Sequence, residues 1–153
     1  MGLTADPVHI HREARVPYPA SRMYDLVNDV ESYPKFLPWC PQADVLSRGE
    51  AEVTARLTLA RSGLHTSFTT RNALVPNERV DMHLQDGPFQ HLHGVWTFTE
   101  QPHGCRVALD MEFEVKGSLR FLLLPVVFAE VCNRLVQSFV AEAHRRARSG
   151  DGD

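Results

Sequence analysis

Histidines recur at two-residue spacing along this chain of 153 residues, and such pairs could share a metal ion. His91 and His93 would lie on one face of a strand, as would His9 and His11, while His83 stands alone on another strand. Each of these faces lies opposite apolar residues and therefore faces water. A third ligand is missing from each pair, so we expect no metal site.

Carboxylates also gather on one predicted strand face, where Asp110, Glu112 and Glu114 alternate with Met111 and Phe113. Paired carboxylates can perform general acid–base chemistry. Alternation turns this row outward, away from the apolar side. Gly-rich phosphate loops and the zinc-protease and serine-hydrolase motifs are missing from the sequence. We therefore expect no catalytic residue and no enzymatic activity.

Arg71 and Asn72 end a predicted strand and are the candidates for a polar contact with a ligand. They could hydrogen-bond a carbonyl group at the mouth of a cavity. They could equally cap the edge of the sheet, because most side-chain hydrogen bonds go to backbone or water.

The composition describes an ordinary globular protein with a formal net charge of -3, which gives no global attraction to nucleic acid or anionic membranes. Cys40, Cys105 and Cys132 are odd in number and widely spaced, so we expect buried, reduced thiols. Residues 1–7 lack a signal-peptide pattern, and the apolar run over 119–131 is too short to span a bilayer. These features predict a cytoplasmic protein.

The elements that must position these groups follow from periodicity. Residues 9–16 predict a short first strand, and alternation predicts further strands over 51–59, 64–75, 80–85, 91–98 and 105–115. Short turns favour an antiparallel meander that is covered on one side. Helical spacing predicts a helix over 19–30, one turn near 32–36, and a long helix over 118–148, which Pro125 kinks or whose true start it marks.

This order predicts one α+β domain over 1–153, with an ordered core of about residues 8–147 and a frayed tail after that. A curved antiparallel sheet wrapped around the long C-terminal helix would cover every apolar face. One helix covers a wide curved sheet incompletely, so either side chains fill the interior or a cavity remains. The candidate lining residues on the sheet and the helix are Phe68, Met82, Leu84, Phe89, Trp96, Phe98, Met111, Phe113, Phe128, Val131 and Leu135.

The segment from Tyr33 to Trp39 is the candidate gate of that cavity. Prolines stiffen it, and Phe36, Leu37 and Trp39 give it apolar side chains. It could close over a ligand or dip into a membrane interface. The alternative is that these residues seal one end of the core.

Four segments carry a family resemblance: 27–40 (VNDVESYPKFLPWC), 68–72 (FTTRN), 86–89 (DGPF) and 92–98 (LHGVWTF). In this order they resemble the coenzyme-Q-binding START-like family, within the polyketide cyclase/dehydrase and lipid transport superfamily. The resemblance is closest to its bacterial ribosome-association branch and covers roughly residues 10–143.

The resemblance implies a helix-grip fold and an apolar tunnel for ubiquinone or another polyprenyl lipid, with no required cofactor, in support of respiration. The bacterial branch implies a second role, a toxin of a toxin–antitoxin system that binds the large ribosomal subunit and blocks subunit association. Arg145, Arg146 and Arg148 form the one basic cluster that could meet rRNA phosphates. A polyketide cyclase is a third alternative, and it would require a titratable group inside the pocket.

Overall fold

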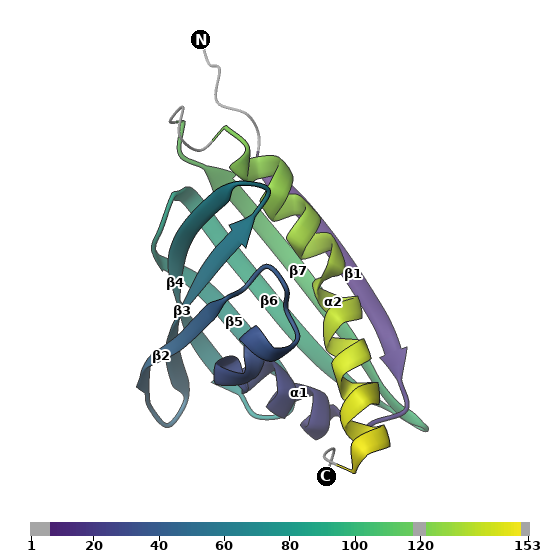
Figure 1. The fold of residues 1–153 in the computed structure, drawn as a ribbon. Helices are drawn as coiled ribbons and strands as arrows, with labels where there is room; N and C mark the ends of the chain where they lie inside the picture. The colour runs from purple at the N-terminus through teal and green to yellow at the C-terminus, as the bar shows by residue number, and fades with distance from the viewer. Residues whose placement is uncertain (1–6, 118–121, 151–153) are drawn as a thin grey trace.

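The protein has the predicted α+β architecture, in which a curved antiparallel sheet wraps around one long helix (Figure 1). The computed structural model describes residues 7–117 and 122–150. The elements are, in order, β1 (Val8–Val16), α1 (Ala20–Asn28), the 3-10 helix η1 (Val30–Lys35), β2 (Gln42–Arg48), β3 (Glu52–Arg61), β4 (Leu64–Val75), β5 (Arg79–Asp86), β6 (Phe89–Gln101), β7 (Gly104–Val115) and α2 (Leu124–Ser149).

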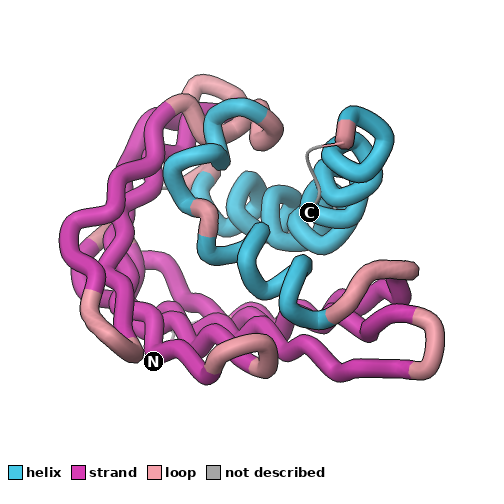
Figure 2. Tube along the Cα trace, turned by 90° about the horizontal axis from the view of Figure 1, so that it is seen from below, coloured by secondary structure: helices cyan, strands magenta, loops and turns pink. Residues whose placement is uncertain are grey.

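The seven strands form one sheet in the order β1-β7-β6-β5-β4-β3-β2. Strands β2 to β7 run as the predicted meander, and β1 completes the sheet by pairing with β7. The sheet bends strongly, so that its concave side surrounds the helices, as the view in Figure 2 shows. The concave side therefore holds the core, and the convex side faces solvent.

One turn in this sheet has a strict steric requirement. Gly104 opens β7 with φ +152°, and a Cβ atom there would lie 1.8 Å from the backbone oxygen of Val16 at the end of β1. Only glycine allows this close approach of two backbones. It fixes where β1 meets β7 and so closes that side of the sheet.

Strand β2 is the element that periodicity missed. Its residues lie at the edge of the sheet, paired only with β3 among the described strands, and their burial pattern does not alternate. Leu46 is even exposed. An edge strand that is only partly covered does not require apolar residues at every second position. The sequence of β2 therefore lacks the alternating pattern that predicted the other strands.

Helix α2 begins at Leu124 and has Pro125 in its first turn, so Pro125 marks the true start of the helix rather than a kink. The first four residues of the predicted range, 118–121, lie outside the described residues, as do 151–153 of the predicted tail. The helix ends at Gly150, which adopts the left-handed conformation common after helix C-termini.

Length and composition alone would allow α2 to cross a membrane. Its apolar stripe is instead buried against the sheet and α1, and this stripe includes Val127, Phe128, Val131, Cys132, Val136, Phe139 and Ala143. That is the arrangement of a core helix and fits a soluble protein. A cytoplasmic location stays a prediction.

Candidate apolar ligand cavity

A cavity of about 60 Å³ lies between the concave face of the sheet, η1 and α2. Its walls come from the five strands β3 to β7, from η1 and α2, and from Trp39 in the loop before β2. The lining residues are Val30, Tyr33, Trp39, Ala55, Leu57, Phe68, Thr70, Asn72, Met82, Leu92, Gly94, Trp96, Met111, Phe128, Val131, Leu135 and Phe139.

Most of the predicted lining residues meet at this cavity. The structure brings together Trp39, Phe68, Met82, Trp96, Met111, Phe128, Val131 and Leu135 from the predicted set. Alternation on the strands and the 3.6-residue period on the helix pointed to all of them except Trp39, which was predicted as part of the gate segment.

Other predicted lining residues belong to the packed core instead. The Phe98 ring meets Tyr24 of α1 edge-on, with ring centroids 5.9 Å apart, and Phe89 and Phe113 surround the Phe128 ring. Leu84 is only partly buried near the end of β5. The cavity occupies the middle of the concave face, so residues toward either end of the sheet fill space around aromatic neighbours.

Sequence reasoning missed several lining residues, above all Tyr33 and Phe139, whose rings pack edge-on with centroids 5.3 Å apart. Phe139 was on the predicted apolar stripe of the helix, and Tyr33 was in the proline-rich segment. No sequence signal ranked them above their neighbours. Val30, Leu57, Leu92 and the small residues Ala55 and Gly94 complete the apolar wall.

The polar groups of the cavity are few and, apart from the Tyr33 hydroxyl and the two tryptophan indoles, come from one strand. Thr70 and Asn72 face inward from β4, and both residues are more than 90% buried. Asn72 Oδ1 is fully buried and makes no hydrogen bond with any described residue. An unsatisfied buried acceptor costs about 1–3 kcal/mol, which makes this amide a group that a ligand could satisfy.

Arg71, predicted together with Asn72 as a polar ligand contact, does not line the cavity. Successive residues of a strand point to opposite faces, so Arg71 lies on the convex side, where its Nε is 3.5 Å from Glu52 Oε2. Of the predicted pair, only Asn72 points inward.

The large apolar side chains of the predicted gate segment pack inward, although Pro34, Lys35 and Pro38 of this segment are exposed. Leu37 and Trp39 are 1% and 7% exposed, and Phe36 is half-buried against the Phe139 ring. Of these three, only Trp39 lines the cavity. The segment therefore seals one end of the core, and membrane contact through it stays a prediction. Among the described residues, the large apolar side chains most exposed to solvent are Leu122, Leu123 and Val126.

The lining carries no Asp, Glu, His, Lys or Arg among the described residues. Its only phenol, Tyr33, donates a hydrogen bond to the Val27 carbonyl oxygen, and burial raises the pKa of that phenol far above its ordinary value. The cavity thus offers no group that would exchange protons near neutral pH.

All three cysteines are free and buried, as predicted, and burial raises the pKa of Cys40 to about 11.

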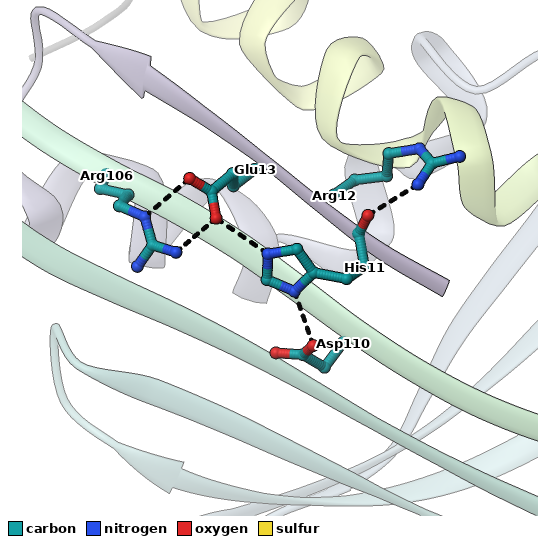
Figure 3. Close-up of polar contacts among 5 residues, drawn as sticks. All are labelled: His11, Arg12, Glu13, Arg106 and Asp110. Atoms are coloured by element: carbon teal, nitrogen blue, oxygen red, sulfur yellow. Dashed lines mark hydrogen bonds and ion pairs between the residues drawn. The ribbon is translucent and has the colours of Figure 1, made fainter. Parts of the chain in front are cut away.

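The convex face carries the predicted solvated histidines and carboxylates in a connected network (Figure 3). His11 lies between Asp110 and Glu13, with nitrogen–oxygen distances of 2.6 and 2.8 Å, and Glu13 also accepts from Arg106. The hydrogen bond to Glu13 is the main cause that raises the pKa of His11. These side chains are about half-exposed, so the network contributes little to stability.

The basic cluster near the C-terminus is largely neutralised by internal ion pairs. Glu142, whose side chain is 4% exposed, accepts from Arg145 at 2.9 Å and from Arg146 at 2.8 Å. Arg146 also reaches Asp29 at the end of α1, with an Nη2–Oδ2 distance of 3.2 Å. Arg146 thus ties α2 to α1, while Arg145 and Arg148 of the predicted cluster are exposed, Arg145 being paired with Glu142.

Acidification should remove part of the stability that Glu142 contributes. The hydrogen bond from Arg145 is the leading cause that lowers the pKa of Glu142 below its ordinary 4.5. A carboxylate whose pKa is lower in the folded protein than in the unfolded protein stabilises the fold at pH values above its unfolded-state pKa. This stabilisation disappears as the pH falls through the folded-state pKa. Glu142→Gln should therefore be less stable than the parent at neutral pH and lose less stability on acidification. Urea unfolding at several pH values measures this, with exposed Glu50→Gln as the control; identical pH profiles for all three proteins would contradict it.

A curved sheet closed by one long helix over an apolar cavity defines a helix-grip, START-like domain. A family model described as polyketide cyclase / dehydrase and lipid transport matches residues 16–140. The chain therefore belongs to this family, as the sequence resemblance predicted.

Two relatives mark different branches of the family. The ribosome association toxin RatA of Pseudomonas aeruginosa is 44% identical over 136 residues, covering 88% of this chain and 94% of the relative. The mitochondrial coenzyme Q-binding protein COQ10 of Drosophila melanogaster is 31% identical and covers 86% of this chain, which spans 57% of that protein.

Solved structures share the fold. The Zhui aromatase/cyclase from Streptomyces sp. R1128 superposes with a TM-score of 0.83 at 19% identity, covering 96% of this chain and 99% of that one. The 18 kDa protein CC1736 from Caulobacter crescentus superposes with a TM-score of 0.69 at 27% identity, covering 94% and 99%. At such identities the cyclase likeness concerns the fold alone.

Proposed function

We propose that this protein holds a hydrophobic molecule with a small polar head, a ubiquinone or another polyprenyl lipid, and performs no chemistry on it. The observation that carries the proposal is Asn72, whose side-chain Oδ1 has no hydrogen-bond partner among the described residues and lies in a mostly apolar cavity. A hydroquinone hydroxyl could donate to the unpaired Oδ1, and a quinone carbonyl oxygen could accept from the Nδ2 of the same amide. The coenzyme Q-binding relative supports the same ligand class, and the proposal includes a role in respiration.

The cavity must enlarge to accept such a ligand. Its volume of about 60 Å³ is well below the roughly 300–1,000 Å³ of pockets for drug-sized ligands. Met82 and Met111 form its most adaptable wall, beside Gly94. Methionine changes rotamer readily, so these two side chains can yield to a guest without a change in the strands.

Both tryptophans of the chain, Trp39 and Trp96, line the cavity, which gives a direct binding assay. A short-chain ubiquinone titrated into the purified protein should quench their fluorescence to saturation at one molecule per chain. Protein purified from a quinone-producing host should also release quinone on extraction, detected by mass spectrometry. Unsaturable quenching together with an empty extract would refute the proposal. A saturated alcohol of similar length, tested in competition with the quinone, distinguishes the two ligand classes. If it displaces the quinone equally well, the site accepts lipids in general.

Gly94→Val should weaken ligand binding with little loss of stability. A Cβ atom at Gly94 would lie 2.6 Å from Met82 Cε and 2.9 Å from Met111 Cε, so it pushes both flexible ends into the cavity. Valine has a higher β-propensity than glycine, and this should offset part of the destabilisation that the crowding causes. The quinone titration measures the loss, and Gly49→Ala, where a Cβ meets only the Glu52 oxygen at 3.6 Å, is the control. Unchanged affinity in Gly94→Val would place the ligand elsewhere.

Binding to the large ribosomal subunit is the second candidate function, that of a toxin blocking subunit association. The specific observation in its favour is the 44% identity to a ribosome association toxin over nearly the whole length of both chains. The paired arginines of α2 do not supply a free basic patch for rRNA, so other surfaces would make the contact. Co-sedimentation with isolated 50S subunits at low and high salt tests it. A pocket and an outer surface are separate sites, so both functions can hold together.

A cyclase reaction is the least favoured of the candidate functions. The aromatase/cyclase likeness is one of fold at 19% identity, and proton transfer in such a reaction needs a titratable side chain within reach of the substrate. The described lining residues offer only the engaged Tyr33 phenol.

A further inference from the structure

Three potential metal ligands converge on the convex face of the sheet. The register of β5 and β6 places His83 directly opposite His93, and Asp81 lies on the same face two residues before His83. Both imidazole Nε2 atoms point at one oxygen, Asp81 Oδ1, at 3.0 Å from His83 and 2.6 Å from His93. The two rings stack with centroids 4.6 Å apart.

We propose that Asp81, His83 and His93 bind a divalent transition-metal ion of the Zn²⁺ class. Two imidazole nitrogens and one carboxylate oxygen are a common donor set for Zn²⁺, with water in the remaining position. Their potential ligand atoms all lie within 4.8 Å of one another. Bonds of about 2.0–2.2 Å to each ligand require only small side-chain adjustments from the present distances.

The second oxygen of the carboxylate is already held in place. Arg79 donates from Nη2 to Asp81 Oδ2 at 2.9 Å, which orients the carboxylate and leaves Oδ1 directed at the imidazoles. Such outer partners fix the geometry of metal ligands in proteins. The site is thus partly organised before any cation arrives.

Sequence spacing pointed to a different pair, His91 with His93, and led to the expectation of no metal site. The structure directs His91 toward Glu112 instead, with an Nε2–Oε2 distance of 3.5 Å. His11 has two carboxylate neighbours, but they lie at different ring nitrogens and cannot share a cation with it. Within residues 7–117 and 122–150, only Asp81, His83 and His93 form a group with this geometry.

A cation here would fasten two strands behind the cavity. The β5–β6 ladder runs from Arg79–Thr97 to His83–His93, which is its last pair before the hairpin turn. The adjacent pair, Met82 and Gly94, faces the cavity from the other side of the sheet. Metal binding should therefore protect the backbone amides of this hairpin from hydrogen exchange.

Calorimetric titration of the purified full-length chain with Zn²⁺ tests the site. We expect one high-affinity ion per chain, reversed by chelator, and affinity at least about tenfold weaker in His83→Gln and in His93→Gln. His91→Gln is the matched control, because it removes a histidine with a carboxylate neighbour from the same strand face. Equal weakening in His91→Gln, or no weakening in His83→Gln, would overturn the proposal.

Thermal unfolding gives an independent readout. Zn²⁺ should raise the melting temperature of the parent and of His91→Gln, because a ligand that binds only the folded state stabilises it. The rise should vanish in the His83→Gln/His93→Gln double variant, whose metal-free melting temperature should lie close to that of the parent, since the His83 side chain is exposed and the His93 side chain is partly exposed. A rise that persists in the double variant would contradict the site.

Discussion

Asn72→Leu is expected to make the free protein more stable and, at the same time, a poorer binder of its ligand. Leucine has a similar volume and removes the buried Oδ1 that has no hydrogen-bond partner. Relief of that desolvation should raise the free energy of unfolding by about 1–3 kcal/mol. The loss of the ligand's polar contact should weaken short-chain quinone binding by about tenfold.

Urea unfolding and the tryptophan-quenching titration measure the two effects on the same samples. Thr70→Val is the matched control, because Thr70 faces the cavity from the same strand yet leaves no fully buried unpaired atom. It should change both quantities less. A destabilised Asn72→Leu would show that the amide has a structural role, and unchanged binding would remove it from the ligand contact.

Phe128→Ala is expected to cost about 3–5 kcal/mol of stability, a large part of the roughly 5–15 kcal/mol of a typical domain. The Phe128 ring joins α2 to the sheet by packing against three other aromatic rings. The ring centroids lie 5.6 Å from Phe68, 4.9 Å from Phe89 and 4.8 Å from Phe113.

Val126→Ala provides the comparison on the same helix turn. Val126 is 72% exposed, so its truncation should change stability by no more than about 0.5 kcal/mol. Chemical denaturation of both variants, followed by circular dichroism, measures the difference. A Phe128→Ala variant within 1 kcal/mol of the parent would mean that the aromatic cluster does not hold α2 in place.

The strands and the helix of the concave core could be predicted because burial on one face imposes a period. Met82, Trp96 and Met111 were found in this way, and Pro125 located the start of α2. The edge strand β2 escaped because it has little buried surface to leave a pattern. Periodicity indicates which face of a strand or helix a side chain occupies, but not which side chains pack against it.

The limits of that information appear at the cavity and on the convex face. Alternation put Phe98 and Phe113 on the correct side of the sheet, but their neighbours Tyr24 and Phe128 decide that they pack as core. In the same way, the meeting of His83 and His93 depends on the register between two strands. A hairpin shifted by one residue would have separated them.

The position of the long helix α2 at the end of the sequence has a consequence for how the chain is made. All seven strands precede α2 in the sequence, so a ribosome completes the whole sheet before its cover exists. Until then the apolar lining is open to water and to other chains, and the final docking joins residues from opposite ends of the sequence. A chain truncated before Leu124 would lack α2 and leave the apolar concave face of the sheet exposed. Such a chain should aggregate readily and bind chaperones.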